Sequence, residues 1–185
     1  MQPSRTLSEH ASKRLLASYG VPCTREALVS DAEAAVAAAE AIGFPVVVKL
    51  CGDTIAHKTE RGLVRVGLSE AAAVRSAAEE LLSRARPEDG DVGLLVAEMV
   101  HGGRELIAGL ARDPDFGPCV MLGLGGILAE ALGDVVFAVV PIDVAEARRL
   151  PHRLAAGHWV TRPFRGEPPG DFADGENQIF VTDRA

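Results

Sequence analysis

The sequence predicts an α/β fold, and three observations support this prediction. Segments with a helical spacing of apolar residues alternate with short β-branched runs in the order helix, strand, helix, strand over residues 8–50. Glycine and proline residues separate these segments, as they do at element boundaries. The chain has 185 residues, of which 48% are hydrophobic. That is enough apolar material for one good-sized domain or for two small subdomains.

A first helix is expected between Ser8 and Gly20. Ser8 is a typical N-cap residue, because its side-chain oxygen can accept a hydrogen bond from a free backbone N–H of the first turn. Gly20 is typical of a helix end. Ala11, Leu15 and Leu16 recur at helical spacing, so they lie together on one apolar face of the predicted helix.

The next predicted elements are a short strand at 27–29, an alanine-rich helix at 32–42 that Gly43 ends, and a strand at 46–48. The run of three valines is too short for a helix and is interpreted as a strand buried on both faces. Lys49 follows it directly. An ammonium group at the end of a buried strand needs an anion, because burial otherwise lowers its pKa. The alternative is a side chain that extends past the last buried residue to solvent.

The rest of the chain continues the alternation of helical and extended segments. Capping residues, helical spacing and Pro/Gly turns predict its elements in order. They are a strand at 62–68, a helix at 71–85, a polar turn at 86–90, a strand at 92–100, a strand at 104–110, a glycine-rich segment at 119–126, a strand at 135–137 and a helix that starts at Asp143 and is interrupted by Pro151.

Composition and charge limit the class of partner and the compartment. The net charge of −7 argues against a nucleic-acid partner, because a phosphate backbone needs a basic face. No apolar run approaches the roughly 18 residues of a membrane helix, and the N-terminus has no signal-peptide core, so we expect a cytoplasmic protein without a membrane partner. Cys23, Cys51 and Cys119 stand singly, which predicts reduced thiols and neither a zinc site nor a disulfide framework.

A histidine and a lysine follow the lysine-tipped strand. The sequence His57-Lys58-Thr59 lies between the strand at 44–50 and an alternating segment at 62–68 that ends in Gly-Leu. By itself, His57 is better interpreted as a surface-loop histidine than as a catalyst. The whole arrangement resembles the ATP-grasp domain of the NDP-forming acyl-CoA synthetases, the family that includes ADP-forming acetate–CoA ligase. This resemblance implies an ATP-grasp fold, with two α+β subdomains and a nucleotide cleft between them.

Further segments extend the resemblance over residues 7–169, and an ATP-grasp domain is expected over 1–170. Its subdomains are expected at roughly 1–20 plus 92–170, and at 21–91. Residues 171–185 have no helical period where the family has a final helix, so they are interpreted as an atypical tail, either disordered or a stray strand. The matching segments are Tyr19-Gly-Val-Pro22, Glu105-Leu-Ile-Ala-Gly109, Arg112-Asp-Pro114, Phe116-Gly-Pro118, residues 123–130, residues 133–137, Pro141-Ile142 and Phe164-Arg-Gly166.

The resemblance implies roles for three residues near the first strand lysine. Lys49 would offset negative charge on the ATP phosphates. His57 would accept the γ-phosphoryl group through a ring nitrogen, and Lys58 would stabilise the resulting phosphohistidine.

The resemblance also implies nucleotide contacts further along the chain. Glu98 would lie beside the adenine and ribose, although a carboxylate at this point also suits the exposed end of a strand. Glu105 opens one of the matching segments and is implied as a nucleotide-binding residue. Gly123, Gly125 and Gly126 either bring phosphate close to backbone N–H groups or allow strands to pack closely.

Two carboxylates are candidate magnesium ligands. Glu130 and Asp134 bracket a turn between two apolar runs. Mg²⁺ needs few protein oxygen ligands and completes its octahedron with water and ATP phosphates. The two side chains are equally well interpreted as solvated turn residues.

The family interconverts acyl-CoA, ADP and phosphate with a carboxylic acid, CoA and ATP, through an acyl phosphate and phosphorylated histidines. This chain resembles only the nucleotide-binding part of such an enzyme. Its expected cofactors are therefore ATP or ADP and Mg²⁺, and its expected partner is a CoA-binding and ligase module from another chain. Two alternatives stay open: a regulatory module that senses ATP or ADP without turnover, and an inactive truncated fragment that is a scaffold without a ligand.

Overall fold

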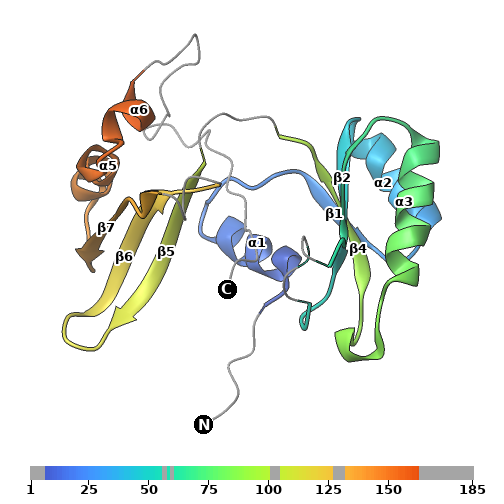
Figure 1. Ribbon diagram of the computed structural model, residues 1–185, viewed down its shortest axis with the longest axis horizontal. Coiled ribbons are helices and arrows are strands. Elements are labelled where there is room, and N and C mark those ends of the chain that lie inside the picture. Colours follow the sequence, from blue (N-terminus) through green and yellow to red (C-terminus); the bar gives the residue numbers. More distant parts are fainter. Residues whose placement is uncertain (1–6, 56–57, 59–60, 101–104, 127–131, 163–185) are drawn as a thin grey trace. The chain divides into compact units, whose positions relative to one another are not determined.

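The computed structural model describes residues 7–55, 58, 61–100, 105–126 and 132–162. These residues divide into two compact units, the first ending at Val100 and the second lying within 101–177. Each unit contains an antiparallel sheet and helices (Figure 1). The observed architecture is therefore α+β within each unit, as expected for the two subdomains.

The first unit is built on a four-stranded antiparallel sheet with the strand order β1-β4-β2-β3. Helices α2 and α3 cover one face of this sheet, and α1 lies at the other face (Figure 1). The elements in chain order are α1 (Glu9–Ser18), β1 (Glu26–Val29), α2 (Ala32–Ile42), β2 (Val46–Cys51), β3 (Val64–Leu68), α3 (Ala71–Ser83), a short 3₁₀ helix (Pro87–Asp89) and β4 (Gly93–Glu98).

Helix α2 shows how local sequence signals set an element. The Asp31 carboxylate accepts a hydrogen bond of 2.9 Å from the backbone N–H of Ala34, which satisfies a donor of the first turn. At the other end, Gly43 has φ 100°, a conformation that side chains other than glycine rarely adopt. The predicted helix at 32–42 is confirmed at both boundaries.

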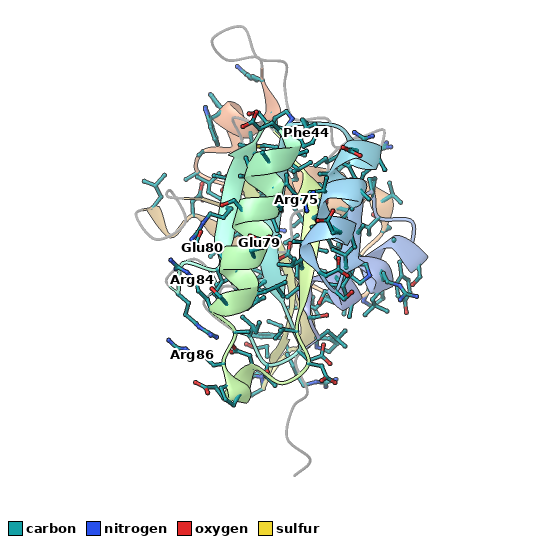
Figure 2. The ribbon with its side chains drawn as sticks, turned by 90° about the vertical axis from the view of Figure 1, so that its right-hand side faces the viewer. Phe44, Arg75, Glu79, Glu80, Arg84 and Arg86 are labelled. Atoms are coloured by element: carbon teal, nitrogen blue, oxygen red, sulfur yellow. The ribbon has the colours of Figure 1, made fainter. Side chains whose placement is uncertain are left out.

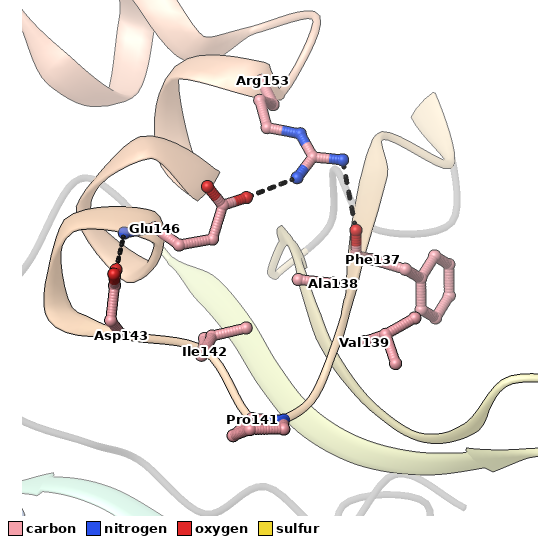
Figure 3. A pocket seen from close by; sticks show the side chains of 8 residues that line it. All are labelled: Phe137, Ala138, Val139, Pro141, Ile142, Asp143, Glu146 and Arg153. Atoms are coloured by element: carbon pink, nitrogen blue, oxygen red, sulfur yellow. Dashed lines mark hydrogen bonds and ion pairs between the residues drawn. The ribbon is translucent and has the colours of Figure 1, made fainter.

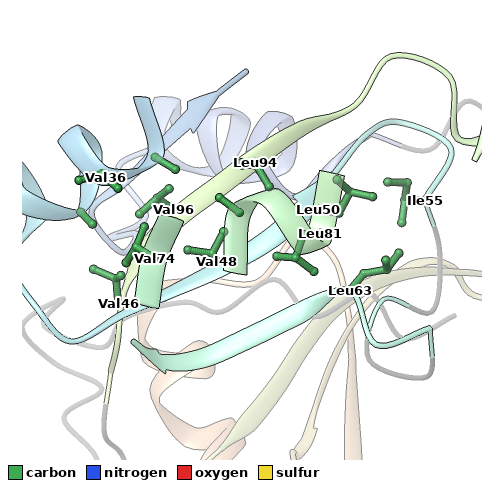
Figure 4. Packing of buried hydrophobic residues seen from close by; sticks show 13 residues of the cluster. Val36, Val46, Val48, Leu50, Ile55, Leu63, Val74, Leu81, Leu94 and Val96 are labelled. Carbon is green, nitrogen blue, oxygen red and sulfur yellow. The ribbon is translucent and has the colours of Figure 1, made fainter. Parts of the chain in front are cut away.

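The apolar core of the first unit lies between the sheet and the helices α2 and α3 (Figure 4). Alternate residues of a strand point to the same face, so every second residue of β2 and β4 contributes to this core. The sheet residues buried here are Val46, Val48, Leu50, Leu94 and Val96, and the helices contribute Ala35, Val36, Ala39, Val74, Ala78 and Leu81.

Lys49 lies inside β2 and not at its end, because the strand continues to Cys51. Its neighbours in the sheet are Val64 of β3 and Leu95 of β4. Since Val48 and Leu50 point to the helices, Lys49 points to the opposite face, where α1 lies. The valine run is therefore buried on one side by apolar residues, and its other side carries the lysine.

The second unit is built on a three-stranded antiparallel sheet with the order β5-β6-β7. A small core of Leu124, Leu154 and Val160 lies between this sheet and two helices. The elements are β5 (Leu106–Asp113), β6 (Gly117–Leu124), β7 (Val135–Val139), α5 (Val144–Arg153) and α6 (Gly157–Thr161). Helix α6 was not predicted from the sequence.

The two units differ from the expected subdomains in where α1 and β4 belong. The sequence grouped residues 1–20 with 92–170, whereas α1 and β4 lie in the first unit. The reason is strand pairing: β4 is a central strand that pairs with β1 on one side and β2 on the other.

Pro151 lies within α5 and does not end it. The sequence predicted that this proline interrupts the helix, but α5 continues to Arg153. Proline removes one backbone donor from the helix. The lost bond is the one to the carbonyl four residues earlier, and α5 extends only two residues beyond the proline. Asp143 caps the start of α5 through a hydrogen bond of 2.7 Å from the backbone N–H of Glu146, as predicted.

The outward face of α3 is charged and contains surface ion pairs (Figure 2). Arg75 pairs with Glu33 of α2, and Glu80 pairs with Arg65 and Arg84. Exposed pairs of this kind contribute little to stability. None of the helices in the described ranges has the length and apolarity that crossing a membrane requires.

Candidate functional site

The predicted phosphate-binding lysine has an anionic partner within the chain. The Lys49 Nζ atom donates to Glu9 Oε1 at 2.7 Å, and the Lys49 side chain is 23% exposed. The ammonium group therefore satisfies the expectation that a charge on this strand needs an anion. The first anion it meets is a carboxylate of α1.

All three lysines of the chain meet at Glu9. Glu9 Oε1 also lies 3.1 Å from the Lys13 ammonium group, and Glu9 Oε2 lies 3.4 Å from the Lys58 ammonium group. The side chains of Glu9, Lys13 and Lys58 are each about 5% exposed or less. We call these four residues, Glu9, Lys13, Lys49 and Lys58, the Glu9 network.

Lys13 connects the Glu9 network to β1. Its ammonium group donates to Glu26 Oε2 at 2.7 Å and to Thr24 Oγ1 at 3.2 Å. Glu26 Oε1 lies 2.8 Å from His10 Nδ1. These contacts fix α1 against the sheet on the face opposite the apolar core.

The network changes the proton affinities of its members. Burial by itself raises the pKa of Glu9, but the ammonium groups of Lys49, Lys13 and Lys58 outweigh it and the net pKa is lowered. Burial by itself lowers the pKa of Lys13, but the hydrogen bond to Glu26 and the charges of Glu9 and Glu26 outweigh it and the net pKa is raised. The geometry therefore keeps these two groups ionised.

Sequence reasoning missed Glu9 because it assigned the wrong face of the first helix to the interior. The buried residues of α1 are Glu9 and Lys13, whereas Leu15 of the expected apolar face is 50% exposed. The available signal was the Glu-Lys spacing of four residues, which places both side chains on one face of a helix. Such a pair is usually a surface pair, so its burial could not be read from the spacing alone.

The predicted phosphoryl acceptor His57 lies outside the described residues. Described residues on both sides of it are anchored. Before it, the Thr54 hydroxyl donates to the backbone oxygen of Asp89 at 2.5 Å. After it, the backbone N–H of Leu63 donates to the Lys58 carbonyl at 2.8 Å, and Lys58 is also part of the Glu9 network. The described residues that flank His57 in the sequence are thus bound to the rest of the first unit.

A second anchor of this segment is a two-bond ion pair between Arg61 and Asp89. The two Arg61 terminal nitrogens donate to the two Asp89 oxygens at 2.7 and 2.8 Å. Asp89 is 2% exposed and also accepts a bond of 2.8 Å from the Arg86 backbone N–H. The hydrogen bond from Arg61 is the main reason why the pKa of Asp89 is lowered to about 2. The sequence analysis did not single out either residue.

Glu98, the predicted hinge residue, is held at the end of β4 by Arg25. One carboxylate oxygen accepts from the Arg25 backbone N–H and the other from Arg25 Nε, both at 2.8 Å. The backbone hydrogen bond is the main reason why the pKa of Glu98 is lowered. The interpretation as a strand-end carboxylate is therefore compatible with the structure, and the nucleotide contact stays a prediction.

The three predicted phosphate-binding glycines occupy positions in the second unit that favour glycine for structural reasons. A Cβ atom on Gly123 would lie 2.7 Å from Val135 Cγ1, so glycine allows β6 and β7 to pack here. A Cβ on Gly125 would lie 3.0 Å from the Glu105 backbone carbonyl carbon, and Gly126 has φ 61°, a conformation that other residues rarely adopt. Close packing accounts for Gly123 and Gly125 and backbone conformation for Gly126, and phosphate binding by them and by Glu105 stays a prediction.

Of the two predicted metal ligands, Glu130 lies outside the described residues. Asp134 Oδ1 accepts from the Ala155 backbone N–H and Oδ2 from the Ala156 backbone N–H, both at 2.8 Å. Among the described residues there is no group of three acidic, histidine or cysteine side chains that could hold a metal ion. Asp134 therefore anchors the connection between α5 and α6, and Mg²⁺ binding by Glu130 and Asp134 stays a prediction.

The second unit also has an open pocket of about 470 Å³ beside β7 and α5 (Figure 3). Its lining includes Phe137, Pro141 and Ile142, together with the pair formed by Arg153 and Glu146 at 3.1 Å. Arg153 also donates to the Phe137 carbonyl at 3.2 Å. None of the predicted site residues that the structure describes lines this pocket.

Comparison with known proteins identifies similar sequences. The family model described as an ATP-grasp domain matches residues 1–180. The β subunit of acetate–CoA ligase (ADP-forming) II from Pyrococcus furiosus is 35% identical over 173 residues, which cover 92% of this chain and 73% of that subunit. The 4-hydroxybutyrate–CoA ligase (ADP-forming) of Nitrosopumilus maritimus is 37% identical over 168 residues, which cover 89% of this chain and 24% of that protein.

A solved structure shares the fold. It is the dinucleotide-forming acetyl-coenzyme A synthetase 1 of Ca. Korarchaeum cryptofilum in complex with coenzyme A and Mg-AMPPCP, with its phosphohistidine segment pointing towards the nucleotide-binding site. The TM-score is 0.74 and the sequence identity 39%, over 88% of this chain and 70% of that chain. This likeness confirms the fold that the sequence resemblance implied.

Proposed function

The chain belongs to the family of ATP-grasp domains. On this basis, we propose that it transfers a phosphoryl group between ATP or ADP and His57. It would do so as the nucleotide-binding part of an ADP-forming acyl-CoA synthetase. The relatives named as ADP-forming CoA ligases support the reaction class.

One observation carries the proposal. The ammonium groups of Lys49 and Lys58 converge on a single buried carboxylate, although one lysine lies on β2 and the other directly follows His57 in the sequence. Positive charge is therefore concentrated close to the backbone that carries the proposed phosphoryl acceptor. Transfer of a γ-phosphoryl group depends mainly on positioning and on such charge, because the reaction needs little other help from the protein.

In the proposed transfer, His57 and the two lysines have separate roles. A neutral ring nitrogen of His57 attacks the γ-phosphorus of ATP and forms an N–P bond. The bond from the γ-phosphorus to the bridging oxygen breaks, and ADP leaves with its electron pair. Lys49 offsets the charge that develops on the nucleotide phosphates, and Lys58 offsets the charge of the phosphohistidine. The reverse step makes ATP from ADP.

The remaining chemistry is assigned to another chain or module. One relative is named as a β subunit, which supports the expectation that a different subunit supplies CoA binding and the ligase step. The nucleotide would enter as its magnesium complex, as the analogue does in the related structure. Glu130 and Asp134 would be the protein ligands of this ion, and its charge would offset that of the phosphates.

Labelling with γ-phosphate-labelled Mg-ATP tests the proposal. We expect a label on the chain that is lost in acid and kept in base, as a phosphoramidate bond requires. The label should be absent from His57→Ala. It should be present in His152→Ala, a matched control, because His152 is an exposed residue of α5 in the second unit.

Two outcomes would overturn the proposal. If calorimetry shows that the chain binds Mg-ATP but takes up no label, even with the partner subunit added, it is a nucleotide sensor. If a well-folded sample shows neither binding nor label, the chain is a scaffold without a ligand.

A further inference from the structure

We propose that Glu9 is a positioning residue for phosphoryl transfer. Its carboxylate orients the Lys49 ammonium group towards the nucleotide phosphates and at the same time holds Lys58, the neighbour of His57. This inference rests on the proposed function and deepens it, because it names the group that connects the phosphate contact to the phosphoryl acceptor.

The contacts of Glu9 join three separate segments. Lys49 lies 40 residues further along the chain, on β2, and Lys58 lies 49 residues further, in the segment after it. Their ammonium groups bind different oxygens of the same carboxylate, at 2.7 Å for Lys49 and 3.4 Å for Lys58. A movement of this carboxylate would therefore displace both lysines together.

Attachment of α1 to the sheet does not by itself require Glu9. Lys13 already binds Glu26 at 2.7 Å and Thr24 at 3.2 Å. His10 adds a contact of 2.8 Å to Glu26. Buried ion pairs contribute little net stability, since the cost of removing the charges from water offsets their attraction. The additional contacts of Glu9 are therefore better explained by the orientation that they impose on Lys49 and Lys58.

The exposed fractions of the side chains indicate which ammonium group of the Glu9 network a nucleotide phosphate can reach. The Lys49 side chain is 23% exposed, whereas those of Glu9, Lys13 and Lys58 are about 5% exposed or less. An ammonium group has three N–H donors. Among the described residues, the recorded partner of Lys49 is Glu9, which uses one donor and leaves others for a phosphate oxygen.

The most informative variant keeps the negative charge at position 9 and shortens the side chain. In Glu9→Asp the carboxylate is one methylene shorter, so it cannot contact Lys49 and Lys58 as Glu9 does. A displacement of a catalytic contact by about 1 Å can slow a reaction about a hundredfold. We expect Mg-ATP affinity to fall about tenfold and the rate of His57 labelling to fall about ten- to a hundredfold.

The matched control is Glu26→Asp, which makes the same change at a buried carboxylate that contacts Lys13 and His10. It should lower the free energy of unfolding by a similar amount and change Mg-ATP affinity and labelling less than twofold. If Glu9→Asp does not fold, Glu9→Gln is the second variant. It keeps the side-chain length and offers one acceptor oxygen for three ammonium groups, so it should lower both the affinity and the labelling rate.

A double-mutant cycle distinguishes an effect of Glu9 on the orientation of Lys49 from a general loss of structure. In the background of Lys49→Met, which should itself weaken Mg-ATP binding, Glu9→Asp should cause almost no further loss of affinity. The proposal is overturned if Glu9→Asp matches the wild type, if Glu26→Asp is equally impaired, or if the two losses of affinity simply add. A wild-type chain without Mg-ATP binding or label would overturn the proposed function as well, so the two failures are distinguishable.

Discussion

The two faces of the first sheet are buried in different ways. On the α2 and α3 face, β2 contributes Val46, Val48 and Leu50, which pack in an apolar core. On the α1 face, the same strand contributes Lys49, which belongs to a network of buried charges. One strand of alternating residues therefore supports two environments, separated by the thickness of the sheet.

The difference shows how stability and chemistry are distributed in this unit. Apolar burial is non-directional, so the α2 and α3 face stabilises the fold with little demand on exact geometry. Buried charges add little net stability and depend strongly on partner and distance. The α1 face is therefore the one expected to determine activity, and the apolar face the one expected to determine the free energy of unfolding.

The largest expected effect is on the apolar face. Leu50→Ala should lower the free energy of unfolding by about 4 kcal/mol, because Leu50 is completely buried and its loss leaves a cavity. The Mg-ATP affinity of the folded fraction should stay close to that of the wild type. Urea unfolding and calorimetry at low temperature measure the two quantities.

Val66→Ala is the control for this prediction, since Val66 of β3 is 63% exposed. It should change the free energy of unfolding by about 0.5 kcal/mol or less. A large loss of nucleotide affinity in folded Leu50→Ala would contradict the separation of the two faces.

A smaller effect is expected from Asp89→Asn, which tests the charged contacts that hold the His57 segment. Removing one partner of this buried pair should cost about 3 kcal/mol at neutral pH. The folded-state pKa of Asp89 is about 2, below the ordinary value of 3.8. The ionised form therefore stabilises the folded state above about pH 4, and this contribution is lost as the pH falls towards 2.

The measurement is urea unfolding of wild type and Asp89→Asn between about pH 7 and pH 2.5. The difference in the free energy of unfolding should shrink steadily below about pH 4. Asp91→Asn is the control, because Asp91 is an exposed carboxylate two residues further along the chain. A difference that is independent of pH would show that the Asp89 charge does not carry the effect.

Local signals predicted most elements of the fold. The Asp31 cap and Gly43 set both ends of α2, and Asp143 set the start of α5. These signals act within a few residues, so a single sequence contains them. The division into units was not predictable in this way. It depends on β4 pairing with β1 and β2, which are contacts over long separations.

The candidate site was predicted in part. Lys49 was singled out because a charge on an apolar strand needs an anion, and the structure provides one in Glu9. Glu9 itself was missed, since its spacing of four residues from Lys13 does not reveal burial and its other two partners lie 40 and 49 residues away. The Arg61–Asp89 pair was missed for the same reason, with a separation of 28 residues.

The smallest expected effect concerns how α1 is held on the charged face. The Ser8 hydroxyl oxygen accepts a hydrogen bond of 3.3 Å from the Ala11 N–H, directly before the turn that carries Glu9. Ser8→Ala should therefore lower the free energy of unfolding by about 0.5–1 kcal/mol. Because ion pairs and not a broad apolar face hold α1, amide hydrogen exchange should rise in α1 and stay unchanged in α2. Ser12→Ala, inside the same helix, should leave exchange unchanged or slow it. Equal acceleration in α1 and α2 would show that the two faces of the sheet are not held independently.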